Sequence, residues 1–144
     1  VLIGEAPGAD EDEQGEPFVG RAGQLLNKIL EAIQLKREDV FICNILKCRP
    51  PNNREPQPEE EEQCEPYLWR QLEILRPKQI LCLGRVAGQA LLKSKDTLTT
   101  LRGKWHSYRG IPTMVTFHPA ALLRNPNWKR PTWEDVPAFK QRYA

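Results

Sequence analysis

The sequence contains no apolar run of about 18 residues, the length that a membrane-spanning helix needs. It also shows no signal-peptide pattern, no internal repeat and no low-complexity tract. Its 144 residues are enough for one domain with a single sizeable core. These features predict a one-domain protein of the cytoplasm.

An initiator Met and a polar lead-in are missing as well. Val1-Leu2-Ile3 already has the composition of a buried strand. We therefore expect residues 1–144 to form a single domain that is truncated at its N-terminus.

Acidic residues are absent from residues 97–130, although the net charge of the whole chain is only +2. The acids gather instead in residues 10–16 and 59–62. The acid-free stretch carries cations and aromatic residues, namely Arg102, Lys104, Arg109, Arg124, Lys129 and Arg130, with Trp105, Tyr108, Phe117 and Trp128. This mixture suits a nucleic-acid surface, because cations bind phosphates and rings stack on bases. A solvated hairpin with core aromatics explains it too, so both interpretations stay open.

Apolar strands alternate with amphipathic helices, which is typical of a parallel sheet covered by helices. The pattern predicts strands at residues 1–4, 39–46, 79–84 and 111–117. It predicts helices at residues 20–34, 59–75 and 133–143, and a short helix that ends at residue 92. Four prolines make residues 49–58 a loop, and residues 97–109 form a small hairpin or an irregular excursion. The expected fold class is α/β, a three-layer sandwich with a central, four-stranded, mainly parallel sheet flanked by helices.

Polar side chains stand where predicted strands end. Glu5 follows the first strand, Asn44 lies near the end of the second, and His118 follows the fourth. Because parallel strands bring their carboxyl ends to one edge, we expect these residues to surround one small ligand.

These residue types can carry out chemistry on a heterocycle. A carboxylate orients water, an amide reads a ring through its donor and acceptor, and a neutral imidazole donates to a developing oxyanion. Phe18 supplies a flat wall for stacking. Taken singly, each residue has a plainer explanation: Glu5 caps a turn, Asn44 satisfies backbone groups, His118 starts a helix and Phe18 belongs to the core.

Four motifs in order resemble the family 4 uracil-DNA glycosylases over essentially the whole chain. They are residues 4–12 (GEAPGADED), 15–26 (GEPFVGRAGQLL), 44–51 (NILKCRPP) and 118–124 (HPAALLR). The resemblance implies the uracil-DNA glycosylase fold. It also implies a prokaryotic DNA repair enzyme that hydrolyses the bond between uracil and deoxyribose.

The resemblance also implies roles for single residues. Glu5 corresponds to the carboxylate that positions water, and His118 to the imidazole that hydrogen-bonds the 2-oxo oxygen of the departing uracil. Phe18 corresponds to the ring that stacks on uracil, and Asn44 to the amide that reads its edge. Glu11 corresponds to the residue beside the ring position where thymine carries its methyl group.

Gly4, at the end of the first strand, is the remaining uracil-binding residue that we expect. A base inside a duplex cannot reach such a pocket and must be flipped out. Residues 119–124 would then insert into the DNA, with Leu122 or Leu123 in the vacated stack and Arg124 on a phosphate. The plainer alternative is a first helical turn that packs its leucines inward. The implied partner is uracil-containing DNA, single- or double-stranded, bound by a monomer with no membrane involved, and no sliding-clamp contact is visible.

Four cysteines occur, at positions 43, 48, 64 and 82. Cys43 and Cys82 lie in predicted apolar strands and suit buried positions. Cys48 and Cys64 bracket the proline-rich loop, and two thiolates cannot complete a site that needs four ligands. The family resemblance implies a structural four-iron, four-sulfur cluster with Cys48 and Cys64 as two ligands and an upstream Cys-x-x-Cys pair as the others. The alternative is that this chain lacks the cluster.

Three competing functions receive less support. A relative that traps uracil-DNA covalently carries a histidine in the loop after the second strand, and residues 49–58 contain none. A non-catalytic DNA-binding module would not need Glu5, Asn44 and His118 together. A phosphate-binding hydrolase-like domain would need a Gly-x-x-x-x-Gly-Lys loop after the first strand, which is absent.

Overall fold

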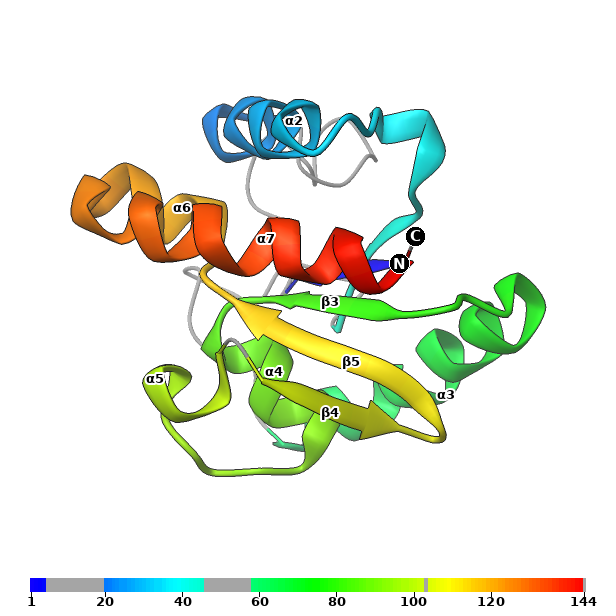
Figure 1. Ribbon diagram of the computed structural model, residues 1–144. Coiled ribbons are helices and arrows are strands. Elements are labelled where there is room, and N and C mark those ends of the chain that lie inside the picture. Colours follow the sequence, from blue (N-terminus) through cyan, green and yellow to red (C-terminus); the bar gives the residue numbers. More distant parts are fainter. Residues whose placement is uncertain (5–19, 46–57, 103, 144) are drawn as a thin grey trace.

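The computed structural model describes residues 1–4, 20–45, 58–102 and 104–143 (Figure 1). Five strands form one sheet in the order β2-β1-β3-β5-β4. Their bounds are β1 Leu2–Gly4, β2 Ile42–Asn44, β3 Ile80–Leu83, β4 Trp105–Tyr108 and β5 Ile111–Thr116. The pairs β1–β2, β1–β3 and β3–β5 are parallel, so the predicted mainly parallel sheet is confirmed.

The sheet has one strand more than the sequence predicted. Residues 105–108 form β4, which pairs antiparallel with β5 at the edge of the sheet. Arg109 and Gly110 connect the two strands, and both have positive φ, at 49° and 85°. A two-residue hairpin turn requires this geometry, since it matches the twist of the strands it joins. Residues 97–109, predicted to form a small hairpin or an irregular excursion, thus contain the helix α5 (Leu98–Leu101) and the strand β4, whose hairpin with β5 extends the sheet.

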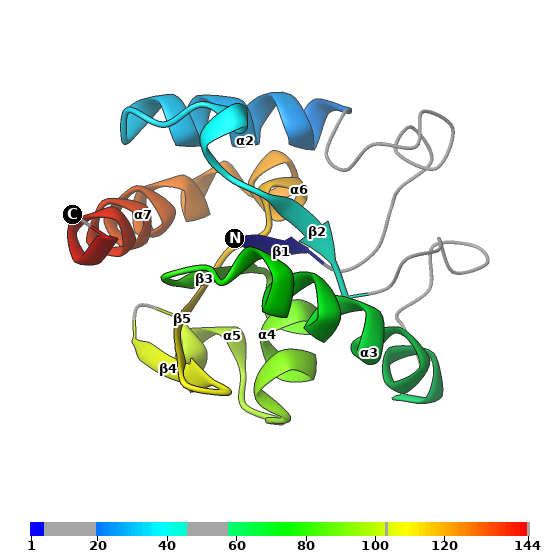
Figure 2. The same ribbon diagram turned by 90° about the vertical axis from the view of Figure 1, so that its right-hand side faces the viewer.

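Helices cover both faces of the sheet, as Figures 1 and 2 show. On one face lie α2 (Arg21–Ala32), α6 (Pro119–Arg124) and α7 (Lys129–Tyr143). On the other face lie α3 (Pro58–Leu75), α4 (Arg85–Leu92) and α5 (Leu98–Leu101). Two short 3-10 turns, η1 (Arg37–Asp39) and η3 (Pro126–Trp128), connect elements. The three-layer sandwich is thus confirmed.

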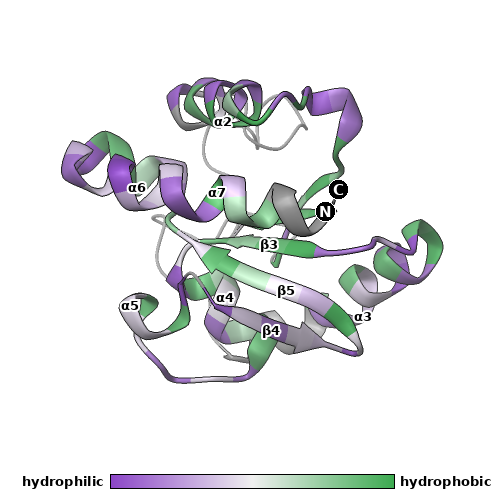
Figure 3. Cartoon of the chain, viewed as in Figure 1, coloured by the Kyte–Doolittle hydropathy of each residue, from purple (hydrophilic) through white to green (hydrophobic). Residues whose placement is uncertain are grey.

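The core follows from strands that are buried on both faces. In β3, Ile80 and Cys82 pack on the α3–α4–α5 side, whereas Leu81 and Leu83 pack on the α2–α7 side. Strands of this kind are apolar throughout rather than alternating. Figure 3 shows β3 in hydrophobic colours over most of its length. In the described parts of the chain, no helix is long and apolar enough to span a membrane.

Some predicted element boundaries differ from the structure. The last helix begins at Lys129 rather than at residue 133, because a proline in the first turn, here Pro131, removes no helical hydrogen bond. The second strand is shorter than 39–46, since η1 ends at Asp39. In α3, Leu68 and Leu72 are buried, while Tyr67 is exposed.

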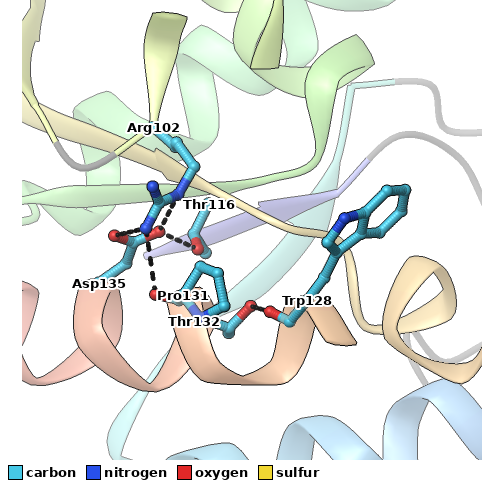
Figure 4. A network of polar contacts seen from close by, with 6 residues as sticks. All are labelled: Arg102, Thr116, Trp128, Pro131, Thr132 and Asp135. Carbon is cyan, nitrogen blue, oxygen red and sulfur yellow. Dashed lines mark hydrogen bonds and ion pairs between the residues drawn. The ribbon is translucent and has the colours of Figure 1, made fainter. Parts of the chain in front are cut away.

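A buried polar network joins α7 to the end of β5 (Figure 4). The Asp135 carboxylate on α7 is almost fully buried and accepts two hydrogen bonds from the Arg102 guanidinium, at 2.9 and 3.1 Å. It also accepts a hydrogen bond from the Thr116 hydroxyl at 2.7 Å. Arg102 donates in addition to the Pro131 carbonyl at 3.3 Å. Residues from three segments therefore hold one another at the end of β5.

We expect Asp135→Asn to lower the free energy of unfolding by about 2–3 kcal/mol, because it leaves the Arg102 charge partly buried and unpaired. Chemical denaturation measures this loss. The control is Lys93→Gln, which removes a surface ion pair with Glu65 at 3.5 Å, where the Lys93 side chain is 72% exposed. That change should cost less than about 1 kcal/mol. Equal losses in the two variants would contradict the importance of the network.

Candidate active site

The carboxyl ends of the parallel strands meet at one edge of the sheet, as the sequence predicted. Gly4 at the end of β1 pairs with Asn44 at the end of β2, and the Ile45 N–H donates to the Gly4 carbonyl at 2.9 Å. On the other side of β1, β3 runs parallel to β5, so that Leu83 pairs with Thr116. His118 follows β5 at this same edge. The structure therefore brings Gly4, Asn44 and His118 to one side of the molecule.

Asn44 occupies the last position of β2 and is only 9% exposed. A side chain buried to this degree has a fixed orientation. An amide in a fixed orientation presents its donor and its acceptor in a defined order. Asn44 is therefore suited to discriminate between ligands whose donor and acceptor positions differ.

His118 is the N-cap of α6, and one hydrogen bond fixes its chemistry. Its Nδ1 accepts the backbone N–H of Ala120 at 3.0 Å. A nitrogen that accepts a hydrogen bond carries no proton, so the proton of the neutral ring resides on Nε2. Burial of the ring lowers the pKa of His118 to about 4, and the nearby positive charge of Arg124 acts in the same direction. At neutral pH, His118 is an uncharged donor.

Gly84 is a residue of this site that the sequence analysis did not single out. It follows β3 with a φ of 101°, and a Cβ at this position would lie 3.0 Å from the Cβ of His118. Only glycine lets the β3 turn approach His118 this closely. The glycine between an apolar strand and a helix in Leu83-Gly84-Arg85 is the signal that would have found it.

The two leucines of α6 have different environments. Leu122 has no exposed surface and packs in a cluster with Leu25 and Ile29 of α2. In this structure Leu122 is a core residue and is not exposed for insertion into DNA. For Leu122, the alternative of a helical turn that packs its leucines inward therefore applies. Leu123 is 37% exposed and Arg124 is exposed. Leu123 and Arg124 are therefore the predicted DNA-binding residues of α6 that are exposed to solvent.

Four of the predicted site residues lie outside the described residues. They are Glu5, Glu11, Phe18 and Cys48.

Comparison with known proteins identifies the family. The sequence model of the uracil DNA glycosylase superfamily matches residues 1–137. The chain belongs to this superfamily. It is 51% identical over 134 residues to a type-4 uracil-DNA glycosylase of Archaeoglobus fulgidus, an alignment that covers 88% of this chain and 67% of the relative. It is 44% identical over 147 residues to the type-4 uracil-DNA glycosylase of Pyrobaculum aerophilum, an alignment that covers 96% of this chain and 75% of the relative.

A type-5 uracil-DNA glycosylase of Pyrobaculum aerophilum is 32% identical over 161 residues, with 100% of this chain and 70% of the relative covered. The higher identities to the type-4 proteins assign the chain to the type-4 uracil-DNA glycosylases, as the four sequence motifs implied.

The basic and aromatic stretch of this glycosylase divides into structural and exposed residues. Arg102 pairs with Asp135 inside the protein. Arg109 lies over the ring of Trp69, with its guanidinium carbon 4.2 Å from the ring centroid. Trp105 stacks on Phe139 of α7 with centroids 6.0 Å apart. The interpretation as a hairpin with core aromatics therefore holds for Arg102 and Trp105, and the nucleic-acid interpretation stays a prediction for the exposed cations.

The described cysteines differ in their suitability as ligands of an iron–sulfur cluster. Cys43 and Cys82 are buried in the sheet, and burial raises the pKa of the Cys82 thiol, which opposes thiolate formation. Cys64 on α3 is only half-buried and forms no disulfide. Within the described ranges, no three His, Cys, Asp or Glu side chains gather where they could hold a metal ion. Of the described cysteines, Cys64 is thus the one whose exposure suits a ligand of an iron–sulfur cluster.

The lowered pKa of His118 makes stability depend on pH in a defined direction. The folded-state pKa is about 4 and the ordinary value is 6.5, so the unfolded state takes up a proton more readily. The folded protein should lose stability as the pH falls from about 6.5 to about 4. NMR titration of the ring should give a midpoint near 4 and a proton on Nε2 above it. His118→Gln should remove this contribution to the pH dependence of unfolding, and a ring midpoint near 6.5 would contradict the assignment.

Proposed function

We propose that this type-4 uracil-DNA glycosylase flips uracil out of DNA and hydrolyses its bond to deoxyribose, with His118 and Asn44 acting on the base. The observation that carries the proposal is the neutral His118 ring, held with its Nε2 proton at the sheet edge that also bears Asn44. The product is an abasic site, the intermediate of base excision repair.

His118 stabilises the leaving base. When the glycosidic bond breaks, the electron pair stays with uracil, and negative charge develops on the oxygens of the ring. A neutral N–H donor stabilises this charge without giving up its proton. A ring with a pKa of about 4 is suited to this role, because it is uncharged at neutral pH.

Asn44 and Gly4 recognise the base. Uracil and cytosine present opposite donor and acceptor groups along one edge of the ring. The buried Asn44 amide satisfies uracil but leaves polar groups unpaired with cytosine, which is costly away from water. Gly4, paired with Asn44, brings its backbone close to the base.

The motif residues outside the described ranges complete the proposed site. Glu5 stabilises the positive charge that develops on the sugar and orients the attacking water. Phe18 stacks on the extruded uracil. Glu11 occupies the space that the methyl group of thymine would need, which excludes that base.

Leu123 and Arg124 contact the DNA duplex from which the uracil has been flipped out. The exposed Leu123 side chain fills the gap in the base stack, and Arg124 binds a nearby phosphate. His118 is the N-cap of the short α6 helix that carries them. Insertion of Leu123 and stabilisation of the base by His118 are thus coupled through one rigid element.

Release of uracil from a single-uracil oligonucleotide under single-turnover conditions tests this function. His118→Ala and Asn44→Ala should each lower the rate by about 10²–10³-fold, the usual effect of removing one preorganised donor. The matched control is His106→Ala. The His106 ring lies outside the proposed site, and its Nε2 is hydrogen-bonded to the Leu101 carbonyl oxygen at 3.0 Å. This variant should retain nearly full activity.

A natural protein that releases no uracil would exclude the glycosylase activity. A covalent protein–DNA product that survives denaturation would exclude turnover. An equal loss in His106→Ala and His118→Ala would remove the specific role of His118.

We propose further that Cys48 and Cys64 are two ligands of a structural four-iron, four-sulfur cluster, with two further ligands from outside residues 1–144. The half-buried, reduced Cys64 supports the assignment. When bound, the cluster would join the segment that contains Cys48 to α3, since its iron atoms bind cysteine thiolates. Hydrolysis of a glycosidic bond moves no electrons, so the cluster has no redox step in this reaction.

Iron analysis tests the cluster. The natural protein purified without oxygen should be brown, and Cys64→Ala should lose the colour and most of the iron. Cys82→Ala is the matched control, because Cys82 is buried in β3 and should not affect iron content. An iron-free natural protein, or a Cys64→Ala variant with full iron content, would contradict the assignment.

A further inference from the structure

An exposed basic corner follows α6 and is not used by the proposed chemistry. It consists of Trp128 at the end of η3 and of Lys129 and Arg130 in the first turn of α7, and we call it the corner surface. All three side chains are exposed. Figure 1 shows the start of α7 beside α6, at the end of the molecule to which β5 points. The corner surface therefore adjoins the edge of the sheet that carries His118.

The two cations of the corner surface form no ion pair with the residues that the structure describes. No acidic residue occurs anywhere in residues 97–130. This distinguishes the two cations from Arg102, which the fold neutralises with Asp135.

Their position is also unfavourable for the helix that carries them. The N-terminal end of a helix is the positive end of its dipole, so cations in the first turn reduce stability. The first turn of α7 contains no acidic residue that would offset them. The nearest acid along the helix is Glu134, one turn beyond Arg130, so the start of α7 keeps an excess of positive charge that attracts an anion.

Trp128 connects the corner surface to the active site. Its indole stacks on the ring of Phe117, which directly precedes His118, with centroids 5.2 Å apart and planes 17° apart. It remains 40% exposed nonetheless. The Trp128 carbonyl accepts the Thr132 hydroxyl at 3.0 Å, in the turn of α7 that the Asp135 network ties to β5 (Figure 4). The corner surface is thus packed directly against the residue that precedes His118.

We propose that the corner surface binds the DNA backbone beyond the extruded nucleotide. Lys129 and Arg130 contact phosphates, and the exposed part of the Trp128 indole lies against the adjoining sugar or base. This inference rests on the proposed function and extends the DNA contact past Leu123 and Arg124. It makes the corner surface a determinant of affinity, while the bond-breaking step depends on the residues at the sheet edge.

The test measures DNA affinity and the maximal rate of uracil release over a range of salt concentrations. Lys129→Gln combined with Arg130→Gln should weaken DNA binding by about 10-fold near 0.1 M salt and reduce the slope of log affinity against log salt by about 1.5. The maximal single-turnover rate should stay within about two-fold of the natural protein, since affinity and not chemistry changes. The melting temperature should not fall, because the change removes cations from the first turn of a helix.

Two further variants control for charge alone. Arg70→Gln with Arg76→Gln removes the same net charge from exposed positions on and after α3, and it should leave the salt slope unchanged. Lys129→Arg with Arg130→Lys preserves the charge and should preserve the slope.

An unchanged slope in the Lys129 and Arg130 double variant, or an equal loss in the α3 variant, would overturn the proposal. So would a lower maximal rate with unchanged affinity, which would make the corner surface a positioning element. Unchanged DNA binding together with lost binding of an acidic protein would assign it to a protein partner instead. Because affinity is measured on the oligonucleotide directly, the proposal can fail while uracil release persists, and it can hold if uracil release is absent.

Discussion

The hydrogen bond from the Ala120 N–H to Nδ1 of His118 is the interaction on which the chemistry that we propose for this protein depends. It satisfies a backbone donor that the start of α6 would otherwise leave without a partner. At the same time it excludes a proton from Nδ1 and so places the proton of the neutral ring on Nε2. A charged ring would have to break the bond, and burial opposes the charge as well. Helix capping and the protonation state of the proposed active site are thus one interaction.

The surrounding fold keeps that interaction in place at some energetic cost. Gly84 has a left-handed backbone that leaves room for His118, and a glycine loses more chain entropy on folding than other residues. The Asp135 carboxylate is buried, which is favourable only because Arg102 and Thr116 both bond to it. Apolar side chains of similar volume would fill the same space at a lower cost in free energy. The network instead fixes the position of α7 relative to the end of β5, and with it the turn that carries His118.

Strand ends could be predicted from the sequence because apolar runs followed by polar residues are local signals. Asn44 and His118 were found this way, and topology then placed them at one edge. The pair Arg102 and Asp135 could not be found, since its partners lie 33 positions apart in the chain and no local pattern links them. The edge strand β4 was not predicted for another reason: only Tyr108 of its four residues is buried, and the strand has no apolar run. Whether Leu122 or Leu123 faces solvent depends on how α6 packs against α2, which only the assembled fold determines.

The basic stretch shows why composition alone does not identify a binding surface. Arg102, Arg109 and Lys129 are equally basic in the sequence, yet they have different roles in the structure. Arg102 pairs with a buried carboxylate, and Arg109 lies over the face of an aromatic ring. Lys129 has neither kind of partner among the described residues. A cation that the fold has already neutralised contributes little to the attraction of DNA, because its field is cancelled at short range. The long-range attraction for DNA that we propose therefore rests on exposed cations such as Lys129, which no described carboxylate pairs with.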